Sequence, residues 1–506
     1  MISSFDPRTA TAVEEVAPPT PPAEVARLCA GAAAAAAGLA AAGRAGRAAM
    51  LRAMAGALEE DRAGLVATAD RETGLGPARL DGELTRTTFQ LRFFAGVIED
   101  GAYLGATIDH AGPTPMGPRP DLRRLLRPRG PAAVFGASNF PFAFSVPGGD
   151  TASALAAGCP VVIKGHEAHP LTSVKCAAAL KRGAAAAGQS ADVVSLVLGR
   201  AAGADLVRDP GIRAVGFTGS LAGGRALSEL ASSRPSPIPF YGELGALNPL
   251  VVCPAAATAG PGELAAGLVG SFTLGVGQFC TKPGLAFVPA GVHGDELVAA
   301  VGRQVAAQDS AVMLSGAVHQ GFLAGSAGLR RSAGVTVLAE GRPPSAAGGW
   351  RGTPQVLLAD PAALSGVLLD ECFGPVLVLV RYESGEQLLE LLSQVGPALT
   401  ATIHAQPPDT ALARRLVEAF ADRVGRIVWN GFPTGVAVAW AMHHGGPYPA
   451  TLDALHTSVG AAAILRWLRP VAYQGVPQAL LPPELTDDPP AGHSVPRRVD
   501  GQLEQA

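Results

Sequence analysis

The sequence predicts an α/β protein in which a doubly wound parallel sheet is followed by a second α/β domain. Three observations lead to this prediction. The 506 residues are 48% hydrophobic and only 16% charged, which is typical of a chain that buries large cores in two or three domains. Short apolar runs alternate with alanine-rich helical stretches from Pro131 to Val252. A similar alternation continues from Asn248 to Asn430.

The first alternating region contains apolar segments of strand length with helical segments between them. The strand candidates are PAAVFG, PVVIK, VVSLVLG, IRAVGFTG and IPFYGELG. Strands of this length between helices indicate parallel βαβ units. Doubly wound sheets bind ligands beyond the carboxyl ends of their strands, so we expect functional side chains in the loops that follow these segments.

The second region has the strand candidates GLAFVP, PVLVLVRY, LTATIHA and RIVWN, with helical segments such as ELVAAVGRQVAAQ and ALARRLVEAFA between them. The N-terminal hundred residues are predicted to be mostly helical and to pack on the first sheet. The segment from Met1 to Pro22 and the tail after Pro482 are rich in proline and polar residues, which predicts flexible ends.

Charge and cysteine usage exclude several classes of protein. With 39 Lys+Arg against 42 Asp+Glu, the net charge is -3, so no positive field attracts nucleic acid or an anionic membrane. The uncharged stretch from Leu28 to Gly43 is predicted to be a buried or half-buried helix because it is too short and too weakly apolar to span a bilayer. The first residues lack a secretion signal, so a cytoplasmic protein is expected. Six cysteines without a CxxC pair argue against a disulfide scaffold or a cysteine zinc site.

Cys280 is the strongest candidate for a nucleophile. It stands in GQFCTKPG, a glycine-flanked loop between a helical segment and a strand. Glycines let the backbone approach a ligand closely, and a cysteine in such a loop is presented rather than packed. A buried thiol in a turn is the alternative interpretation of this residue taken alone.

Two further polar residues follow predicted strands. Glu243 ends the strand in YGELGALNP, where a carboxylate can reach a central cleft and act as a general base. Asn139 follows a strand in GASNFPFAFSVPGG, where its amide can donate to a developing oxyanion. Taken singly, the acid would be a solvated loop residue and the asparagine a turn former.

Together and in this order, these motifs resemble the aldehyde dehydrogenase superfamily. The resemblance covers roughly Arg44 to Leu485. It rests on SNFPFAFSVPGG, GFTGS, ELGALNP, GQFCTKPG and ECFGPVLVLV. It implies an aldehyde dehydrogenase-like fold, with a Rossmann-type cofactor domain, a catalytic domain that carries the nucleophile and a small oligomerisation arm. It also implies NAD(P)-dependent oxidation of an aldehyde to a carboxylic acid through a cysteine thiohemiacetal and thioester.

The resemblance gives each motif residue a role. Cys280 matches the family nucleophile, Asn139 with the amide of Cys280 matches the oxyanion hole, and Glu243 matches the base that activates water. A free cysteine has a pKa of about 8.5, so a nearby positive charge or the bound cofactor must favour the thiolate. Lys282 is a candidate for that charge, and a solvated loop lysine is the alternative.

The resemblance also predicts the residues that bind NAD or NADP. These are Lys164, Glu167, Arg200, Gly219, Ser220, Gly224, Glu371 and Phe373. Glu167 would accept bonds from the ribose hydroxyls and repel a 2′-phosphate, whereas Lys164 and Arg200 would attract one. The preference between NAD and NADP therefore stays open, with Glu167 favouring NAD. For Phe373, ordinary core packing is an equal alternative.

Within the superfamily, the chain is most similar to α-ketoglutaric semialdehyde (2,5-dioxopentanoate) dehydrogenases. This likeness extends to VVIKGHEAHPLTS, NGFPTGVAV, AMHHGGPYPATLDALHTSVG and RPVAYQGVPQALLPPEL. It implies a substrate that carries a carboxylate, which a cation or amide donors must hold. The candidates are Arg86, Gln90 and Arg92, in a helix that lies near the substrate entrance in the family.

The predicted domains follow from the same likeness. Residues 1–106 and 128–246 form the NAD(P)-binding domain, and residues 247–440 form the catalytic domain. Residues 107–127 and 441–506 form the bridging, oligomerisation and C-terminal segments, so a homodimer or homotetramer is expected. No metal site is predicted, because the paired histidines lack carboxylate-rich neighbours in the sequence. The HHGG stretch is instead expected to shape a loop beside the substrate pocket.

Two alternatives remain at this point. An NADP-dependent long-chain aliphatic aldehyde dehydrogenase would share these motifs but not the carboxylate-bearing substrate. A cofactor-free cysteine acyl hydrolase or a non-catalytic scaffold would belong to another class of protein, and its thermal melting would not respond to NAD or NADP.

Overall fold

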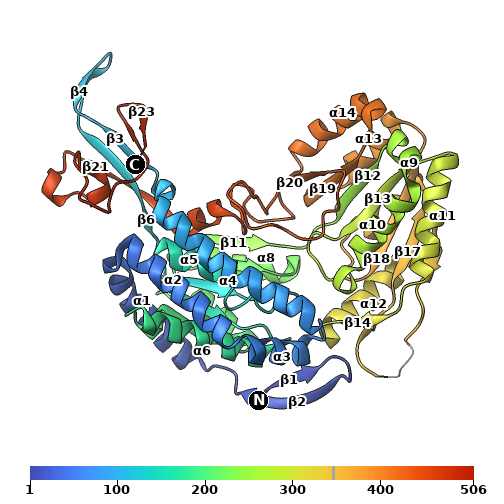
Figure 1. The fold of residues 1–506 in the computed structure, drawn as a ribbon, viewed down its shortest axis with the longest axis horizontal. Coiled ribbons are helices and arrows are strands. Elements are labelled where there is room, and N and C mark those ends of the chain that lie inside the picture. The colour runs from blue at the N-terminus through green and yellow to red at the C-terminus, as the bar shows by residue number, and fades with distance from the viewer. Residues whose placement is uncertain (345–347, 506) are drawn as a thin grey trace.

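The computed structural model describes residues 1–344 and 348–505, which form two lobes and a projecting arm (Figure 1). The first lobe contains a five-stranded sheet and the N-terminal helices, and the second contains a seven-stranded sheet. After the second lobe, the chain returns to the first lobe and ends in the arm (Figure 1). This arrangement confirms the predicted fold class.

The sheet of the first lobe is parallel throughout and has the order β11-β10-β7-β8-β9. Its strands are β7 (Ala132–Phe135), β8 (Val161–Lys164), β9 (Val194–Val197), β10 (Ala214–Thr218) and β11 (Phe240–Glu243). The chain enters at the central strand β7 and builds outward first on one side and then on the other. The loops after β7 and β10 therefore flank the point at which the strand order reverses, where such sheets bind ligands.

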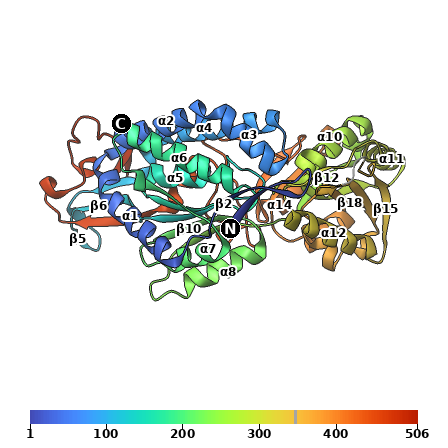
Figure 2. The ribbon, with the colours of Figure 1, turned by 90° about the horizontal axis from the view of Figure 1, so that it is seen from below.

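Helices cover both faces of this sheet, as Figure 2 shows. The helices that connect its strands are α5 (Gly149–Ala157), α6 (Pro170–Ala186), α7 (Arg200–Arg208) and α8 (Leu221–Ser232). The N-terminal helices are α1 (Pro22–Ala41), α2 (Gly43–Glu60), α3 (Arg62–Thr73) and α4 (Pro77–Asp100). Apolar residues of α2, α4, α5 and α6 share one core, and those of α1 and α7 share another on the opposite face.

The second lobe has the strand order β15-β17-β18-β13-β12-β19-β20, and every pairing is parallel except that of β15 with β17. The strands are β12 (Asn248–Val252), β13 (Pro283–Pro289), β15 (Val335–Glu340), β17 (Gln355–Ala359), β18 (Val376–Tyr382), β19 (Ala398–His404) and β20 (Val424–Trp429). Its helices are α9 (Pro254–Ala259), α10 (Pro261–Thr273), α11 (Val292–Ala306), α12 (Gly316–Arg331), α13 (Gly385–Gln394) and α14 (Thr410–Ala421). A short ladder pairs β14 (Ala311–Val312) with β16 (Arg351–Gly352).

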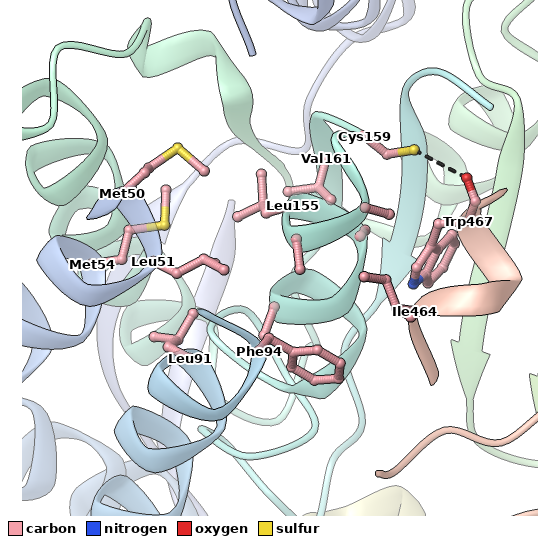
Figure 3. Packing of buried hydrophobic residues seen from close by; sticks show 14 of the residues in the cluster. Met50, Leu51, Met54, Leu91, Phe94, Leu155, Cys159, Val161, Ile464 and Trp467 are labelled. Carbon is pink, nitrogen blue, oxygen red and sulfur yellow. Dashed lines mark hydrogen bonds between the residues drawn. The ribbon is translucent and has the colours of Figure 1, made fainter. Parts of the chain in front are cut away.

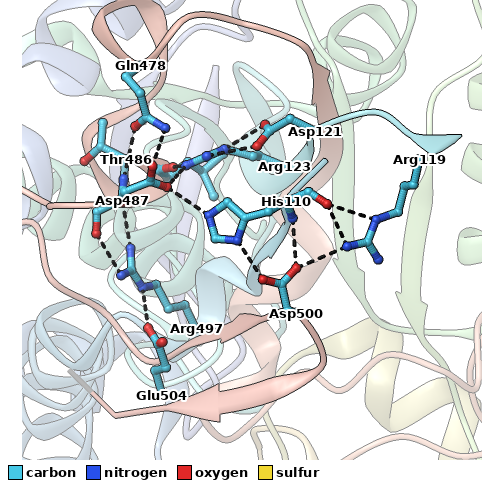
Figure 4. Close-up of polar contacts among 11 residues, drawn as sticks. His110, Arg119, Asp121, Arg123, Gln478, Thr486, Asp487, Arg497, Asp500 and Glu504 are labelled. Atoms are coloured by element: carbon cyan, nitrogen blue, oxygen red, sulfur yellow. Dashed lines mark hydrogen bonds and ion pairs between the residues drawn. The ribbon is translucent and has the colours of Figure 1, made fainter. Parts of the chain in front are cut away.

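The arm is a five-stranded sheet of order β21-β6-β3-β22-β23, with the hairpin β4-β5 beside it. Its strands are β3 (Ala106–Asp109), β4 (Gly112–Thr114), β5 (Gly117–Arg119), β6 (Leu122–Pro128), β21 (Leu468–Gln474), β22 (Arg497–Val499) and β23 (Gln502–Glu504). The prediction of a flexible tail was therefore wrong, because its charged residues find partners in the arm (Figure 4). His110 bonds to Asp500 at 2.7 Å, and Arg123 bonds to Asp487 at 2.7 Å.

The N-terminal segment was also wrongly predicted to be flexible. It forms an antiparallel hairpin of β1 (Ile2–Asp6) and β2 (Thr11–Ala17). Arg8 bonds to the Asp70 carboxylate at 2.7 Å, and the Trp350 amide donates to the Pro7 carbonyl at 2.9 Å. These partners are distant in sequence, so local composition gives no sign of them.

Helix α1 includes most of the uncharged stretch that was expected to be a buried or half-buried helix. By length and composition alone, it is the one described helix that passes as a possible membrane span, with a mean hydropathy of 1.3. In the structure one face of α1 packs on the first lobe, where Val25, Leu28, Cys29 and Ala32 join the core. A helix packed in this way passes the same test, so its hydropathy alone indicates no membrane.

The core of the first lobe joins its helices to the C-terminal segment (Figure 3). Met54 of α2 and Phe94 of α4 are buried together with Leu155 of α5. Trp467 is also fully buried, and its indole nitrogen donates to the Ser153 hydroxyl at 2.8 Å. Residues 461–467, which lie within the predicted bridging, oligomerisation and C-terminal segments, thus contribute to the core of the first lobe.

Candidate active site

The candidate site lies where three separate segments meet. Glu243 ends β11 of the first lobe, Cys280 precedes β13 of the second, and His444 belongs to the returning C-terminal segment. The Cys280 Sγ lies 3.5 Å from His444 Nε2, and that nitrogen lies 2.8 Å from Glu243 Oε1. The structure therefore brings together the predicted nucleophile and the predicted base.

The loop that carries Cys280 has an unusual backbone. Gly275, Val276 and Gly277 have φ values of 55°, 60° and 65°, so three successive residues are left-handed and the valine is strained. A Cβ on Gly277 would lie 2.3 Å from the Gly374 carbonyl oxygen, so this loop touches the backbone that precedes β18. The turn leaves Cys280 half-buried, while the other five cysteines are buried.

The surroundings of Cys280 favour the thiol over the thiolate. Burial raises the pKa of Cys280 well above its usual value, and the neighbouring Glu243 raises it further. Lys282 does not face the sulfur: its Nζ donates to the carbonyls of Cys372 at 3.1 Å and Val376 at 2.9 Å. The suggestion that Lys282 favours the thiolate is therefore replaced by a structural role, in which it anchors the loop before β18.

Glu243 is almost fully buried, with 4% of its surface exposed. Burial acts to raise the pKa of Glu243, but His444, Ser458 and the Cys280 thiol act against it and leave that pKa below its ordinary value. Ser458 Oγ donates to Oε2 at 2.5 Å. The group is consequently a carboxylate at neutral pH, which is the form that a general base requires.

Asn139 lies against the nucleophile loop. Its Nδ2 donates to the Gln278 carbonyl at 2.9 Å, and its own carbonyl accepts a bond from Arg79 at 2.8 Å. Arg79 also lies over the ring of Phe279, 4.9 Å from the centroid. The asparagine amide is thus held two residues from Cys280, close to where an oxyanion would form.

A buried acid of α4 holds the Asn139 loop in place. Glu83 Oε1 accepts bonds from the amides of Phe142 at 2.8 Å and Ala143 at 3.0 Å. Arg79 and Glu83 were not predicted as functional, because their partners lie about 60 residues away in sequence. Their spacing of four residues on one helix face is the only local signal.

Of the three predicted substrate residues, the structure brings only Arg86 to the site. Its guanidinium lies over Phe144 at 4.9 Å, its Nη2 donates to the Val436 carbonyl at 3.4 Å, and its buried Nη1 has no partner in the described part of the chain. Burial lowers the pKa of Arg86, while the charges of Glu83, Cys280 and Glu243 oppose this shift. Arg86 is thus within electrostatic reach of the reacting sulfur.

The other two candidates lie elsewhere on α4. Gln90 is buried and donates to the Ala143 carbonyl at 3.3 Å, so it supports the Asn139 loop. Arg92 is exposed and lies near Thr88 and Glu59, at 3.2 Å and 4.0 Å. Six residues beyond Arg86, an α-helix has turned by about 240°, which explains why Arg92 points away from Arg86.

The predicted cofactor residues occupy the carboxyl ends of the first sheet. Lys164 ends β8 and forms an ion pair with Glu167 at 2.5 Å, and Arg200 begins α7. Gly219 and Ser220 are exposed at the N-terminus of α8, where Ser220 Oγ accepts a bond from the Gly223 amide at 3.2 Å. This small-residue turn at a helix start suits a dinucleotide diphosphate, so the residues fit the implied cofactor.

On the side of the second lobe, Glu371 faces the same junction. Burial raises the pKa of Glu371 to about 7. A Cβ on Gly245 would lie 2.1 Å from Glu371 Oε2, so the absence of a side chain at Gly245 admits this carboxyl group. Phe373 is half-buried two residues later, and Gly224 packs against Leu244.

Asn248 ties the base segment to the nucleophile segment. Its Nδ2 donates to the carbonyls of Cys280 at 2.8 Å and Lys282 at 3.0 Å, while its Oδ1 accepts a bond from the Thr400 amide at 3.1 Å. One buried amide therefore fixes the start of β12, the loop before β13 and the start of β19 at once.

His444 and Ser458 were not predicted as functional residues. The paired histidines were expected to lack a carboxylate neighbour, but His444 contacts Glu243, which lies 201 residues earlier. The expected placement of HHGG beside the substrate pocket was the only sequence signal for His444, and there was none for Ser458.

Comparisons with known proteins find relatives of this chain. The model of the aldehyde dehydrogenase family matches residues 1–449. The chain is 44% identical over 465 residues to alpha-ketoglutaric semialdehyde dehydrogenase 2 of Azospirillum brasilense, covering 90% of this chain and 87% of that protein. It is 42% identical over 442 residues to alpha-ketoglutaric semialdehyde dehydrogenase of Acinetobacter baylyi, covering 86% and 83%. The solved structure of a 3,6-anhydro-L-galactose dehydrogenase superposes with a TM-score of 0.79 at 20% identity, covering 93% of this chain and 95% of that one.

Proposed function

Since this chain belongs to the aldehyde dehydrogenase family and is a nicotinamide-dependent oxidoreductase, we propose that it oxidises α-ketoglutaric semialdehyde to 2-oxoglutarate, with Cys280 as the nucleophile. The observation that carries the proposed mechanism is the meeting of Cys280 and Glu243 at the junction of the two lobes. A cofactor-free hydrolase or a scaffold is no longer an alternative.

The residues divide the reaction among them. Glu243 accepts the proton of the Cys280 thiol and releases it to solvent before the thioester forms. The Cys280 thiolate adds to the aldehyde carbon, and Asn139 Nδ2 with the Cys280 amide receives the negative oxygen, each donor of this kind being worth about 2.7–4 kcal/mol. A bound nicotinamide supplies the acceptor for the hydrogen and two electrons of that carbon. Glu243 then removes a proton from the water that attacks the thioester, the C–S bond breaks, and the acid leaves.

The substrate proposal rests on Arg86 and on the relatives. The two relatives, at 44% and 42% identity, act on α-ketoglutaric semialdehyde by name. The partnerless Nη1 of Arg86 is a buried cationic donor that a substrate carboxylate would satisfy. A long-chain aliphatic aldehyde offers no such acceptor, so Arg86 favours the dioxo acid over that alternative.

The cofactor proposal is a preference for NAD over NADP. Glu167 neutralises Lys164, the cation at the end of β8, and leaves its own carboxylate to accept from ribose hydroxyls. Burial lowers the pKa of Lys164, and the charge of Glu167 counteracts this shift. The 2′-phosphate of NADP would lie close to the negative Glu167 carboxylate, and the repulsion between the two negative groups disfavours its binding.

The first test replaces the nucleophile. Cys280→Ala should lower kcat for aldehyde oxidation on the order of 10⁴-fold or more, because no other group can form the thioester. Reduced-cofactor absorbance measures the rate. Cys29→Ala, at a buried cysteine of α1, is the matched control and should retain the parental rate. If Cys280→Ala oxidised aldehydes as fast as the parent, the assignment of the nucleophile would be wrong.

The second test compares two arginines of α4. Arg86→Ala should raise KM for α-ketoglutaric semialdehyde by about 10- to 100-fold, since a charge-assisted hydrogen bond is lost. KM for an unbranched aliphatic aldehyde should change much less. Arg92→Ala, on the exposed side of the same helix, should leave both values unchanged. Equal losses for both aldehydes in Arg86→Ala would contradict a carboxylate-binding role.

The third test concerns the coenzyme. Glu167→Gln should raise the ratio of kcat/KM for NADP to that for NAD several-fold, because it removes a negative charge and frees Lys164 to meet a 2′-phosphate. Steady-state kinetics with each coenzyme measure the ratio. An unchanged ratio would refute the role of Glu167 in coenzyme choice.

The fourth expectation is self-association into a homodimer or homotetramer through the arm. The arm extends beyond the first lobe (Figure 1), and its edge strand β23 is exposed along its whole length. Such an edge can pair with another chain. Sedimentation velocity should give a mass of two or four chains, whereas a monomer at micromolar concentration would count against the proposal.

A further inference from the structure

Both carboxylate oxygens of Glu243 are held by one segment that belongs to neither lobe's sheet. His444 Nε2 lies 2.8 Å from Oε1, and Ser458 Oγ lies 2.5 Å from Oε2. The exposed fractions are 4% for Glu243, 1% for His444 and 6% for Ser458. Because all three are buried, these bonds do not compete with solvent.

The partners of His444 assign its proton. Nε2 faces the Glu243 carboxylate, and the buried Nδ1 has no partner in the described part of the chain. A hydrogen on Nε2 therefore bonds to the Glu243 carboxylate, whereas a hydrogen on Nδ1 would have no acceptor in the described part of the chain. With Nε2 acting as a donor, the Cys280 sulfur at 3.5 Å cannot pass its proton to that nitrogen. Glu243 is therefore the group that accepts the proton of the Cys280 thiol.

The segment that supplies these donors is itself fixed. The His444 amide donates to Thr457 Oγ1 at 2.7 Å, and the Ser458 amide donates to the His444 carbonyl at 3.0 Å. The Leu244 amide donates to the Ala450 carbonyl at 2.8 Å, which attaches the segment to the residue after Glu243. The loop that contains residues 444–458 is thus closed on itself and joined to the end of β11.

We propose that His444 and Ser458 are positioning residues that together form a two-donor clamp on Glu243. The clamp keeps Glu243 ionised and directed at the Cys280 thioester. During thioester hydrolysis, the oxygen of water bonds to the acyl carbon, one proton of that water passes to Glu243, and the C–S bond breaks to release the Cys280 thiolate. This inference rests on the proposed role of Glu243 as the base.

The polar and charged groups that face Glu243 come from three segments. Of these, Arg86 from α4 is the cation, while His444 from the C-terminal segment and the Cys280 thiol from the nucleophile loop act as hydrogen-bond donors. Arg86 favours the carboxylate in parent and variants alike. Removing one donor of the clamp should therefore raise the pKa of Glu243 without removing all of its stabilisation.

The test uses an acyl-enzyme that needs no coenzyme. p-Nitrophenyl acetate acylates Cys280, excess reagent is removed, and the hydrolysis rate of the acetyl-enzyme is measured against pH. In Ser458→Ala and His444→Leu, the acid limb of this profile should move to higher pH by about one unit or more, as expected for a lost hydrogen bond to a charged group. Protonating Glu243 abolishes the base, so the rate falls as pH drops through its raised pKa.

Conservative variants separate positioning from simple packing. Ser458→Thr keeps the hydroxyl, and His444→Gln keeps an N–H near the place of Nε2, so both should restore the parental acid limb. His443→Gln, at the half-buried neighbouring histidine, is the control and should not move it. Stoichiometric labelling of Cys280 by iodoacetamide verifies that each variant has a folded site.

The outcomes are distinct. If Ser458→Ala and His444→Leu both retain the parental acid limb, the clamp is refuted. The same holds if Ser458→Thr and His444→Gln fail to restore a limb that has moved. If Glu243→Gln hydrolyses the acetyl-enzyme at the parental rate, Glu243 is not the base and the proposed function fails at that residue, whatever the clamp variants do.

Discussion

The side-chain amide of Asn248 is the interaction on which the geometry of the site depends. Asn248 follows Glu243 by five residues, and its Nδ2 donates to the Cys280 carbonyl at 2.8 Å. The base ends a strand of one sheet and the nucleophile lies in the loop before a strand of the other, so no regular backbone ladder sets their separation. The five-residue stretch of chain from Glu243 to Asn248 and the buried bond from Asn248 Nδ2 to the Cys280 carbonyl together hold the base close to the nucleophile. Because Asn248 Oδ1 is also bonded, to the Thr400 amide at 3.1 Å, the amide cannot rotate without leaving a buried group unpaired.

Two carboxyl groups flank Cys280, the buried Glu243 and the half-buried Glu371, and their surroundings drive their pKa values apart. Burial alone would raise both. For Glu243, His444 and Ser458 overcome the effect of burial and the pKa is lowered, whereas burial prevails at Glu371 and its pKa rises to about 7. At neutral pH Glu243 is therefore charged, whereas Glu371 is partly protonated. This division suits a site that needs one fixed base but cannot tolerate two full negative charges beside a thiolate.

Much of this site was predictable from local sequence, and the remainder depends on contacts between distant segments. Cys280, Glu243 and Asn139 stand in motifs directly beside strand ends, so their short segments contain the information that places them. His444 becomes functional only when a C-terminal segment returns across the lobe junction to Glu243, 201 residues away. The hairpin β1-β2 and the tail strands were missed for the same reason, since proline and charge predict flexibility unless distant partners exist. Arg92 shares its helix with Arg86 but lies on another side of it, because the helical turn decides which residues face the site.

The positive charges at the site are oriented by backbone carbonyls, which composition cannot reveal. Arg86 of α4 donates to the Val436 carbonyl at 3.4 Å, and Arg426 of β20 donates to those of Pro433 at 2.6 Å and Gly435 at 3.0 Å. The Gly435 amide in turn donates to Thr281 Oγ1 at 3.2 Å, next to the nucleophile. A single segment, residues 433–436, therefore links two guanidinium groups to the residue after Cys280. Each guanidinium uses part of its donors on carbonyls and is thereby fixed in direction. A substrate carboxylate would then meet a preoriented cation and lose little of its binding energy to side-chain ordering.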